Sequence, residues 1–372
     1  MNELKFVCPC LLGIEGLVAD ELRKMGALNV LAHNGRVTFS GDYNILARAN
    51  ICSRYAERVL ILVGEFEACS FEELFCGVKS LPWENFIGKK DAFPVKGSSI
   101  NSKLTSIPDC QSIIKKAVVE RLKSKYNLPW FEETGELYQI KFNIMKDRVS
   151  VMIDTSGAGL HKRGYRKISN AAPIKETLAA ALVNIAHVRR DSYLIDPFCG
   201  SGTILIEAAL YAMNIAPGLK RTYAAEMWQK ISSNIWSQER ERAISLERRN
   251  INFKAVGYDI DADAVNLTIE NAKKAGVSSC ITAGVRDIKN FSFNNKAGIV
   301  ICNPPYGERL LDKERAEDIY RVMGKVFKKN ENLNCYIISA DEKFEQFFGR
   351  KSDKKRKLYN GMLKCQYYMY FK

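Results

Sequence analysis

A short apolar strand, a glycine turn and an apolar helix follow one another between Tyr193 and Leu210. The strand ends in Asp196, and Gly200 and Gly202 lie in the turn that leads into the helix. Glycine lets the backbone approach a ligand closely where a parallel strand turns into a helix. No Gly-Lys-Ser/Thr follows, which excludes a triphosphate-binding P-loop, and the third glycine of the dinucleotide fingerprint is missing. The segment predicts a site for an adenosine without phosphate, although a tight strand-to-helix turn alone gives a similar pattern.

Three acidic residues follow the next predicted strands. The apolar run 255–258 ends in Asp259, which is placed to accept both hydroxyls of a ribose. Asp261 fits the N-cap of the amphipathic helix that comes next. The strand near 280–284 leads to Asp287, which is either an acceptor for the adenine amino group or a solvated loop acid.

The tetrapeptide Asn303-Pro304-Pro305-Tyr306 ends the apolar run 298–302. Adjacent prolines end a strand and hold the chain extended, so carbonyl groups there lack partners within the strand. The Asn303 side-chain oxygen and the Pro304 carbonyl can then accept both hydrogens of one amino group, while Tyr306 offers a ring to stack on a base. A proline-rich turn is the alternative for the tetrapeptide in isolation. Together with the upstream turn and acids, it predicts a site that directs a planar amine at a methyl donor.

In these motifs the chain resembles the class I S-adenosylmethionine-dependent methyltransferases, within the subgroup that methylates amino nitrogens of nucleobases or of glutamine. The resemblance implies that S-adenosylmethionine is the cofactor, with its methionine part near Asp196, its ribose at Asp259 and its adenine at Asp287. Such a reaction needs placement of donor and acceptor and no catalytic histidine or cysteine. The implied donor-binding residues are Asp196, Phe198, Gly200, Gly202, Thr203, Asp259, Ile260 and Asp287, and the implied catalytic residues are Asn303, Pro304, Pro305 and Tyr306.

Cysteines and histidines indicate no other chemistry. The eleven cysteines include no Cys-x-x-Cys pair, and the three histidines complete no metal site, so no metal is expected. Cys199 and Cys302 border the predicted site and are interpreted as small packing residues. Reduced cysteines, no signal segment and no apolar run of about eighteen residues lead us to expect a cytoplasmic protein without a membrane partner.

Basic residues favour a polyanionic substrate. The net charge is +14, and the excess follows residue 160, where 36 basic residues stand against 23 acidic ones. The segment 161–167 interleaves cations with an aromatic residue, which suits phosphate contact and base stacking. Lysines of the predicted helix 109–126 could follow a phosphate backbone or belong to a solvated face. The RNA-binding residues predicted on these grounds are Lys162, Arg163, Tyr165, Arg166, Lys115 and Lys116.

The region before residue 160 predicts a separate α+β unit of two consecutive strand-and-helix stretches. This layout, placed ahead of the methyltransferase motifs, resembles THUMP-domain RNA methyltransferases over essentially the whole chain. The nearest resemblance is to the methylase half of the bacterial enzymes that methylate N2 of a guanine in 23S ribosomal RNA. It implies an α/β fold: a ferredoxin-like plus THUMP region at 1–160, with the THUMP domain at about 44–155, and a Rossmann-like methyltransferase sheet at 161–372.

Three further expectations concern the rest of the chain. Residues at about 214–254 exceed the short connection that a minimal Rossmann unit needs, and predict inserted helices that cover the donor or shape an RNA cleft. The basic run 350–357 leads into a terminal hairpin, where its lysines either protect an edge strand or contact RNA. Alternatives to the ribosomal substrate are a guanine-N2 methyltransferase of transfer RNA, a DNA adenine-N6 methyltransferase and a non-catalytic RNA-binding or assembly factor.

Overall fold

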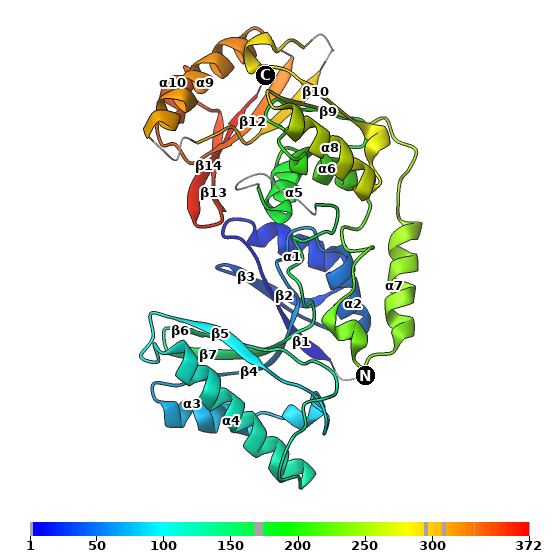
Figure 1. Ribbon diagram of the computed structural model, residues 1–372, viewed down its shortest axis with the longest axis vertical. Coiled ribbons are helices and arrows are strands. Elements are labelled where there is room, and N and C mark those ends of the chain that lie inside the picture. Colours follow the sequence, from blue (N-terminus) through cyan, green and yellow to red (C-terminus); the bar gives the residue numbers. More distant parts are fainter. Residues whose placement is uncertain (1–2, 167–173, 294–296, 307–309, 331, 372) are drawn as a thin grey trace.

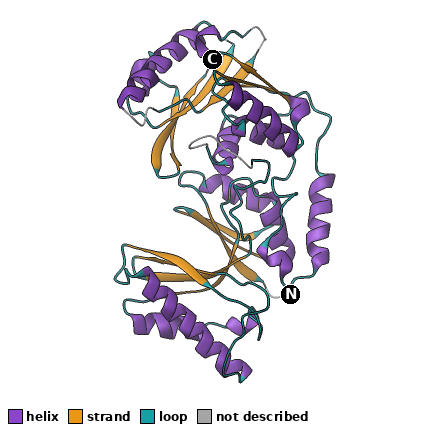
Figure 2. Ribbon diagram, viewed as in Figure 1, coloured by secondary structure: helices purple, strands orange, loops and turns teal. Residues whose placement is uncertain are grey.

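Two seven-stranded sheets, each with its own helices, make up the molecule (Figure 1). The computed structural model describes residues 3–166, 174–293, 297–306, 310–330 and 332–371. Figure 2 shows the first sheet in the lower half of the view and the second in the upper half, with helices against both. This arrangement confirms the predicted α/β class. Within the described residues, no helix combines the length and the apolar character that crossing a membrane requires.

The first sheet has the strand order β2-β3-β1-β4-β7-β6-β5. β1 pairs with β3 through six residue pairs, but with β4 through Phe6↔Ile61 and Val7↔Leu60 alone. The two halves of the predicted N-terminal region therefore share one continuous sheet with a narrow seam. Its strands are β1 (Leu4–Pro9), β2 (Leu28–His33), β3 (Arg36–Gly41), β4 (Leu60–Glu67), β5 (Val95–Ile100), β6 (Ile140–Met145) and β7 (Arg148–Asp154).

Capping residues determine where helices of this region begin and end. The Ser70 hydroxyl accepts from the backbone N–H of Glu73, and the Glu73 carboxylate accepts from that of Ser70, so a capping box starts α3. α4 ends at Asn127, whose φ of 53° is left-handed. Figure 1 shows α3 and α4 packed together on one face of the sheet. The helices are α1 (Glu15–Lys24), α2 (Tyr43–Cys52), α3 (Phe71–Ser80), η1 (Trp83–Asn85) and α4 (Ile107–Tyr126).

The second sheet has the strand order β10-β9-β8-β11-β12-β14-β13. Its first five strands are parallel, and β14 is antiparallel to both of its neighbours. Helices connect most of the parallel strands, as in a doubly wound fold. The strands are β8 (Tyr193–Asp196), β9 (Lys254–Asp259), β10 (Ile281–Val285), β11 (Gly298–Cys302), β12 (Leu333–Ser339), β13 (Lys354–Asn360) and β14 (Leu363–Tyr370). The helices are α5 (Glu176–Ile185), α6 (Thr203–Ala212), η2 (Ala224–Met227), α7 (Ser233–Ser245), α8 (Ala262–Ala275), η3 (Ser278–Cys280), η4 (Ile288–Asn290), α9 (Leu310–Lys328) and α10 (Phe344–Phe348).

The strands and helices predicted around the motifs are confirmed. β8, β9, β10 and β11 begin and end within two residues of the predicted runs, and β13 and β14 form the predicted terminal hairpin. β13 is the edge strand of its sheet, in agreement with the interpretation of its lysines as edge protection. The sequence did not predict β2, β12 or α9.

The insertion after α6 packs against the N-terminal region. The Arg48 guanidinium of α2 donates to both carboxylate oxygens of Glu239 in α7, at 2.8 and 2.6 Å. The Trp228 ring stacks on Tyr138 with centroids 4.4 Å apart, and its indole N–H donates to the Leu137 carbonyl at 3.0 Å. Figure 1 shows α7 standing alongside α2. The predicted inserted helices are confirmed, and these contacts tie the two regions of the molecule together. A role in covering the donor or in shaping an RNA cleft stays a prediction.

Candidate active site

The predicted donor and acceptor residues meet at one edge of the second sheet. Asp196 ends β8 opposite Gly257 of β9, and Asp259 ends β9 opposite Val285 of β10. On the other side of β8, Ile195 lies opposite Val300 of β11, so the tetrapeptide at 303–306 follows at the same edge. The strand order reverses between β8 and β11, and α/β sheets bind ligands at such a switch point.

The glycine turn leaves room for a ligand at one position and none at the other. Gly200 and Gly202 have φ angles of 53° and 81°, in the left-handed region that favours glycine. A Cβ on Gly202 would lie 2.8 Å from Cγ2 of Thr268, whereas a Cβ on Gly200 would have no heavy atom within 4 Å. Gly202 therefore serves close packing of the turn, and open space lies beside Gly200. The methionine part of S-adenosylmethionine could occupy that space.

Two side chains of α8 hold this turn, and neither was predicted from the sequence. The Thr268 hydroxyl donates to the Gly200 carbonyl at 2.8 Å, and the Asn271 amide donates to the Ser201 carbonyl at 3.0 Å. Both side chains are buried. Polar residues on the inward face of an amphipathic helix were the signal in the sequence, because buried polar groups require partners.

Asp259 lies at the end of β9 with both carboxylate oxygens engaged by the backbone. It accepts from the N–H of Gly200 at 2.9 Å and from that of Asp261 at 3.1 Å. Asp261 caps α8 by accepting from Asp263 at 2.9 Å, so the predicted N-cap is confirmed. A carboxylate oxygen has more than one acceptor site, and the half-buried Asp259 retains capacity for ribose hydroxyls.

Apolar side chains flank this carboxylate. Ile260 is 73% exposed and Val285, opposite Asp259 in the register, is 61% exposed. An adenine ring is planar and largely apolar, so these exposed side chains fit the adenosine part of the donor. Asp287 is half-buried and caps η4 by accepting from the Lys289 N–H at 2.8 Å.

Asp196 is almost completely buried, and its carboxylate accepts from the Phe198 N–H at 3.0 Å. Burial and, to a smaller extent, the charge of Asp259 raise the pKa of Asp196 to about 8, against the lowering effect of the hydrogen bond from Phe198. A buried carboxyl of this kind favours a cationic neighbour, which would stabilise its ionised form. The amino group of a bound methionine moiety is such a cation.

The acceptor loop presents an amide oxygen that a tyrosine orients. The Tyr306 hydroxyl donates to Oδ1 of Asn303, and burial raises the pKa of Tyr306 well above its usual value, so the hydroxyl stays protonated. The Tyr320 hydroxyl of α9 donates to the Pro305 carbonyl at 3.0 Å. Pro304 is buried and Pro305 exposed. The half-buried Tyr306 ring packs against the core, and its stacking on a base stays a prediction.

Three of the four RNA-binding residues predicted at 162–166 contact buried acids. Arg163 and Tyr165 are 5% and 4% exposed. The Arg163 Nε lies 3.5 Å from a Glu207 carboxylate oxygen, which also accepts from the Tyr165 hydroxyl at 3.0 Å. Arg166 forms an ion pair with Glu176 at 3.1 Å and donates to the Thr203 hydroxyl at 3.0 Å. We correct the prediction for Arg163, Tyr165 and Arg166, because buried acids already engage them. Lys162 is exposed, and Lys167 lies outside the described residues.

The two lysines of α4 differ. Lys115 pairs with Glu133, donates to the Phe93 carbonyl at 3.2 Å and lies 3.5 Å from the centre of the Phe93 ring. These partners hold Lys115 against its own domain and weaken its assignment to RNA. Lys116 is exposed, as a phosphate contact requires.

Cysteines near the site are packing residues, as expected. Cys199 and Cys302 are buried, and burial raises the pKa of both thiols, which disfavours a thiolate nucleophile. The described part of the chain contains no group of three or more His, Cys, Asp or Glu side chains arranged to hold a metal ion.

Comparisons with known proteins agree with this geometry. Residues 163–369 match the family "RMKL-like, methyltransferase domain", residues 5–60 the "RlmL ferredoxin-like domain" and residues 68–154 the THUMP domain. The chain is 42% identical to the Bacillus subtilis protein named "Putative RNA methyltransferase YpsC", over 100% of this chain and 97% of the relative. It is 32% identical to "Ribosomal RNA large subunit methyltransferase K/L" of Psychromonas ingrahamii, over 97% of this chain but 49% of that protein, so it spans about half the length of this relative.

A crystal structure of a related protein also supports a methyltransferase fold. The structure described as "SMU.472, a putative methyltransferase complexed with SAH" superposes with a TM-score of 0.94 at 40% identity, covering 100% of this chain and 98% of the other. The sheet-edge site, the matched domains and these relatives together show that the chain belongs to the RMKL-like methyltransferase family, with an RlmL ferredoxin-like domain and a THUMP domain ahead of its catalytic domain.

Proposed function

We propose that this protein transfers a methyl group from S-adenosylmethionine to the exocyclic N2 amine of a guanine in large-subunit ribosomal RNA. The observation that carries the proposal is the position of Asn303-Pro304-Pro305-Tyr306 at the end of β11, across the switch point from the glycine turn of β8. A THUMP domain match in the same chain supports an RNA substrate.

The groups at the ends of β8 and β9 bind different parts of the methyl donor. S-Adenosylmethionine supplies an activated methyl group and its own leaving group. Asp196 attracts the amino group of its methionine part, the open side of Gly200 admits the chain of that moiety, and Asp259 accepts from its ribose. Ile260 and Val285 cover the adenine, and Asp287 accepts from its amino group.

The acceptor side depends on Asn303. Its amide oxygen has two acceptor positions, and the Tyr306 hydroxyl occupies one of them. The other accepts one hydrogen of the guanine amine, and the Pro304 carbonyl accepts the second. Two acceptors on one amine draw electron density toward the nitrogen and stabilise the positive charge that develops there during transfer. Tyr306 and Tyr320 are positioning residues, because they orient Asn303 and the Pro305 carbonyl.

Support for ribosomal RNA over other polyanions comes from the matched domains and from one relative. The name of the Psychromonas ingrahamii relative assigns it to large-subunit ribosomal RNA, and the present chain aligns with about half of that protein. The net charge of +14 suits any nucleic acid and does not select among them. Transfer RNA and DNA adenine are therefore outcomes of the test.

A methyl-transfer assay on purified substrates tests the proposal. The full chain is incubated with labelled S-adenosylmethionine and, separately, with large-subunit ribosomal RNA, transfer RNA and duplex DNA, all from cells that lack the protein. Digestion and nucleoside mass spectrometry then identify the product. We expect N2-methylguanosine in the ribosomal sample. N2-methylguanosine in transfer RNA alone, or N6-methyladenine in DNA, would replace the proposed substrate with the corresponding alternative.

A further inference from the structure

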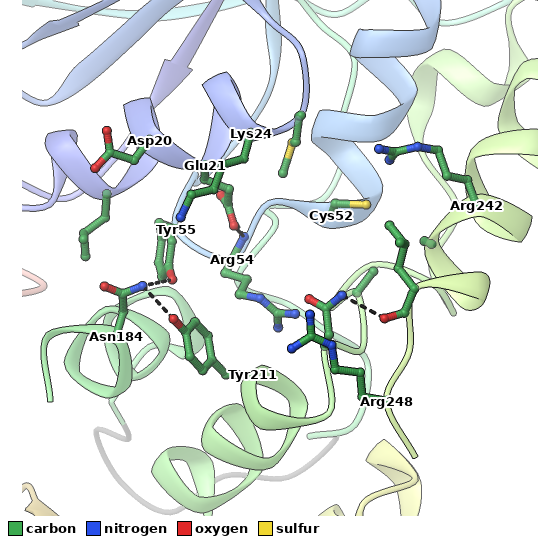
Figure 3. Close-up of a pocket in the computed structure, with 16 residues that line it drawn as sticks. Asp20, Glu21, Lys24, Cys52, Arg54, Tyr55, Asn184, Tyr211, Arg242 and Arg248 are labelled. Atoms are coloured by element: carbon green, nitrogen blue, oxygen red, sulfur yellow. Dashed lines mark hydrogen bonds between the residues drawn. The ribbon is translucent and has the colours of Figure 1, made fainter. Parts of the chain in front are cut away.

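A large hollow in the described part of the molecule lies away from the donor site. It has a volume of about 600 Å³ and is lined by α1, the residues that follow α2, the end of α5, the end of α6 and the segment after α7 (Figure 3). The glycine turn precedes the first residue of α6, whereas Tyr211 and Asn214 line the hollow at the other end of that helix. Ten helical residues span about 15 Å, so the hollow and the donor site are separate.

The hollow is basic and continues into a second one. An adjoining space of about 410 Å³ shares Tyr211 and Arg248 with it. Six basic side chains line the two spaces against three acidic ones, and the basic set is Lys24, Arg54, Arg189, Arg190, Arg242 and Arg248. An excess of guanidinium groups around one concave surface attracts anions.

Arg54 supplies a buried donor that lacks a partner. The residue is 8% exposed, and its Nη1 has no hydrogen-bond partner among the described residues. Its guanidinium lies 5.7 Å from the centre of the Tyr211 ring. Glu21 is close, but its carboxylate accepts from the Ser53 hydroxyl at 2.7 Å and from the Arg54 backbone N–H at 2.9 Å. This Nη1 is closed off from solvent, whereas other atoms of the residue line the hollow. Burying a guanidinium with incomplete hydrogen bonding costs free energy, and an anion in the hollow beside it would offset that cost.

Arg248 completes the pair of cations. Figure 3 shows the Arg54 and Arg248 side chains extending into the same part of the hollow. Arg248 is exposed and forms no ion pair with any described residue, whereas its neighbour Arg249 pairs with Glu247 at 2.6 Å. Arg189 and Arg190 likewise have no acidic partner in the described ranges. Basic side chains outnumber acidic ones in the lining and repel one another, and an anion between them would reduce that repulsion.

We propose that this hollow is a binding site for a phosphate group, held between Arg54 and Arg248. Planar guanidinium groups match the geometry of phosphate oxygens and form paired hydrogen bonds with them. The Asn184 amide donates to the Tyr55 and Tyr211 hydroxyls at 2.9 and 3.1 Å, which fixes a polar aromatic wall beside the arginines. The phosphate belongs either to a free phosphorylated compound or to a nucleic acid. The site is independent of the proposed methyl-transfer reaction.

Pyrophosphate binding tests the site directly. The full chain is titrated with pyrophosphate by calorimetry at low salt, next to two charge-reversal variants, Arg248→Glu and Arg249→Glu. Both residues are exposed, so neither change threatens the core, and a thermal melt verifies folding. We expect saturable binding to the wild type, at least about tenfold weaker binding to Arg248→Glu, and an unchanged affinity in Arg249→Glu, which lies outside the lining. No saturable binding to the wild type, or an equal loss in both variants, would overturn the proposal.

A competition experiment identifies the source of the phosphate. A fluorescent fragment of large-subunit ribosomal RNA is bound to the wild type and to Arg248→Glu, and pyrophosphate is added to each. Displacement of RNA from the wild type but not from the variant upholds the site and assigns it to RNA backbone. Retained RNA at pyrophosphate concentrations that saturate the site upholds it and assigns it to a free phosphorylated compound.

Discussion

The acceptor loop at 303–306 and the linker at 161–166 each combine polar residues with a tyrosine, but the fold places them in different environments. The loop ends a parallel strand at the sheet edge, where Asn303 is half-buried and Pro305 exposed. The linker lies against α6, where Glu207 engages Arg163 and Tyr165. Polar and aromatic residues of a motif can bind a ligand where they follow the end of a strand at the surface. Residues of the same kinds stabilise the fold where they form ion pairs or hydrogen bonds with buried acids.

Replacing Arg163 should destabilise the linker strongly. Arg163→Met leaves the carboxylate of Glu207 buried without its cation, and removing one partner of a buried ion pair costs about 3–5 kcal/mol of unfolding free energy. Chemical denaturation measures this loss. The matched variant Lys162→Met, at the exposed neighbouring position, should leave stability unchanged. If folded Arg163→Met loses RNA affinity while keeping its stability, the linker is an RNA contact after all.

The acceptor side predicts the next effect. Asn303→Ala removes the amide oxygen that accepts from the amine, and loss of one such group slows transfer by about a hundredfold or more. Binding of S-adenosylhomocysteine should stay unchanged, because Asn303 lies across the switch point from the donor residues. Single-turnover methyl transfer and calorimetry separate the two. The control is Asn266→Ala on the exposed face of α8, and turnover in Asn303→Ala equal to that of the control would remove Asn303 from the chemistry.

Two neighbouring acids, Asp259 and Asp261, should have separate roles in donor binding and in helix capping. Asp259→Ala should weaken S-adenosylhomocysteine binding by about tenfold to a hundredfold, because hydrogen bonds to a charged acceptor contribute about 1.5–3 kcal/mol each. Asp261→Ala should leave that affinity intact and lower the stability by about 1 kcal/mol, since it removes a helix N-cap. Calorimetry and denaturation on both variants give the two numbers, and an equal loss of affinity would contradict the separate roles.

The smallest expected effect is a pH dependence of donor binding. Burial, opposed by the Phe198 hydrogen bond and reinforced by Asp259, raises the pKa of Asp196 to about 8. Its carboxylate ionises as the pH rises, so affinity for the cationic methionine moiety should increase about tenfold between pH 6 and 7, where the amino group of that moiety stays protonated. Because the folded pKa exceeds the unfolded one, the free protein should also lose stability from about pH 4 to 8. Asp196→Asn should flatten both profiles, and an unchanged slope in that variant would assign the dependence to another group.

The sequence predicted those parts of the fold that local chemistry decides. The β8 strand, its glycine turn and α6 follow from an apolar run and two left-handed glycines, and the Asp261 cap follows from one side chain beside a helix start. β2 escaped prediction because its residues are mostly exposed and show no alternation. Thr268 and Asn271 were missed because their partners lie about seventy residues earlier. Arg163 was misassigned because nothing in its neighbourhood reveals that Glu207 faces it.

The most direct test of the central claim is nucleoside mass spectrometry on ribosomal and transfer RNA from cells that lack the protein and carry either the wild-type gene or Asn303→Ala. The account predicts that N2-methylguanosine returns to the large-subunit ribosomal fraction with the wild type and stays absent with Asn303→Ala. Equal N2-methylguanosine in all fractions, whether the gene is missing, mutated or intact, would contradict it.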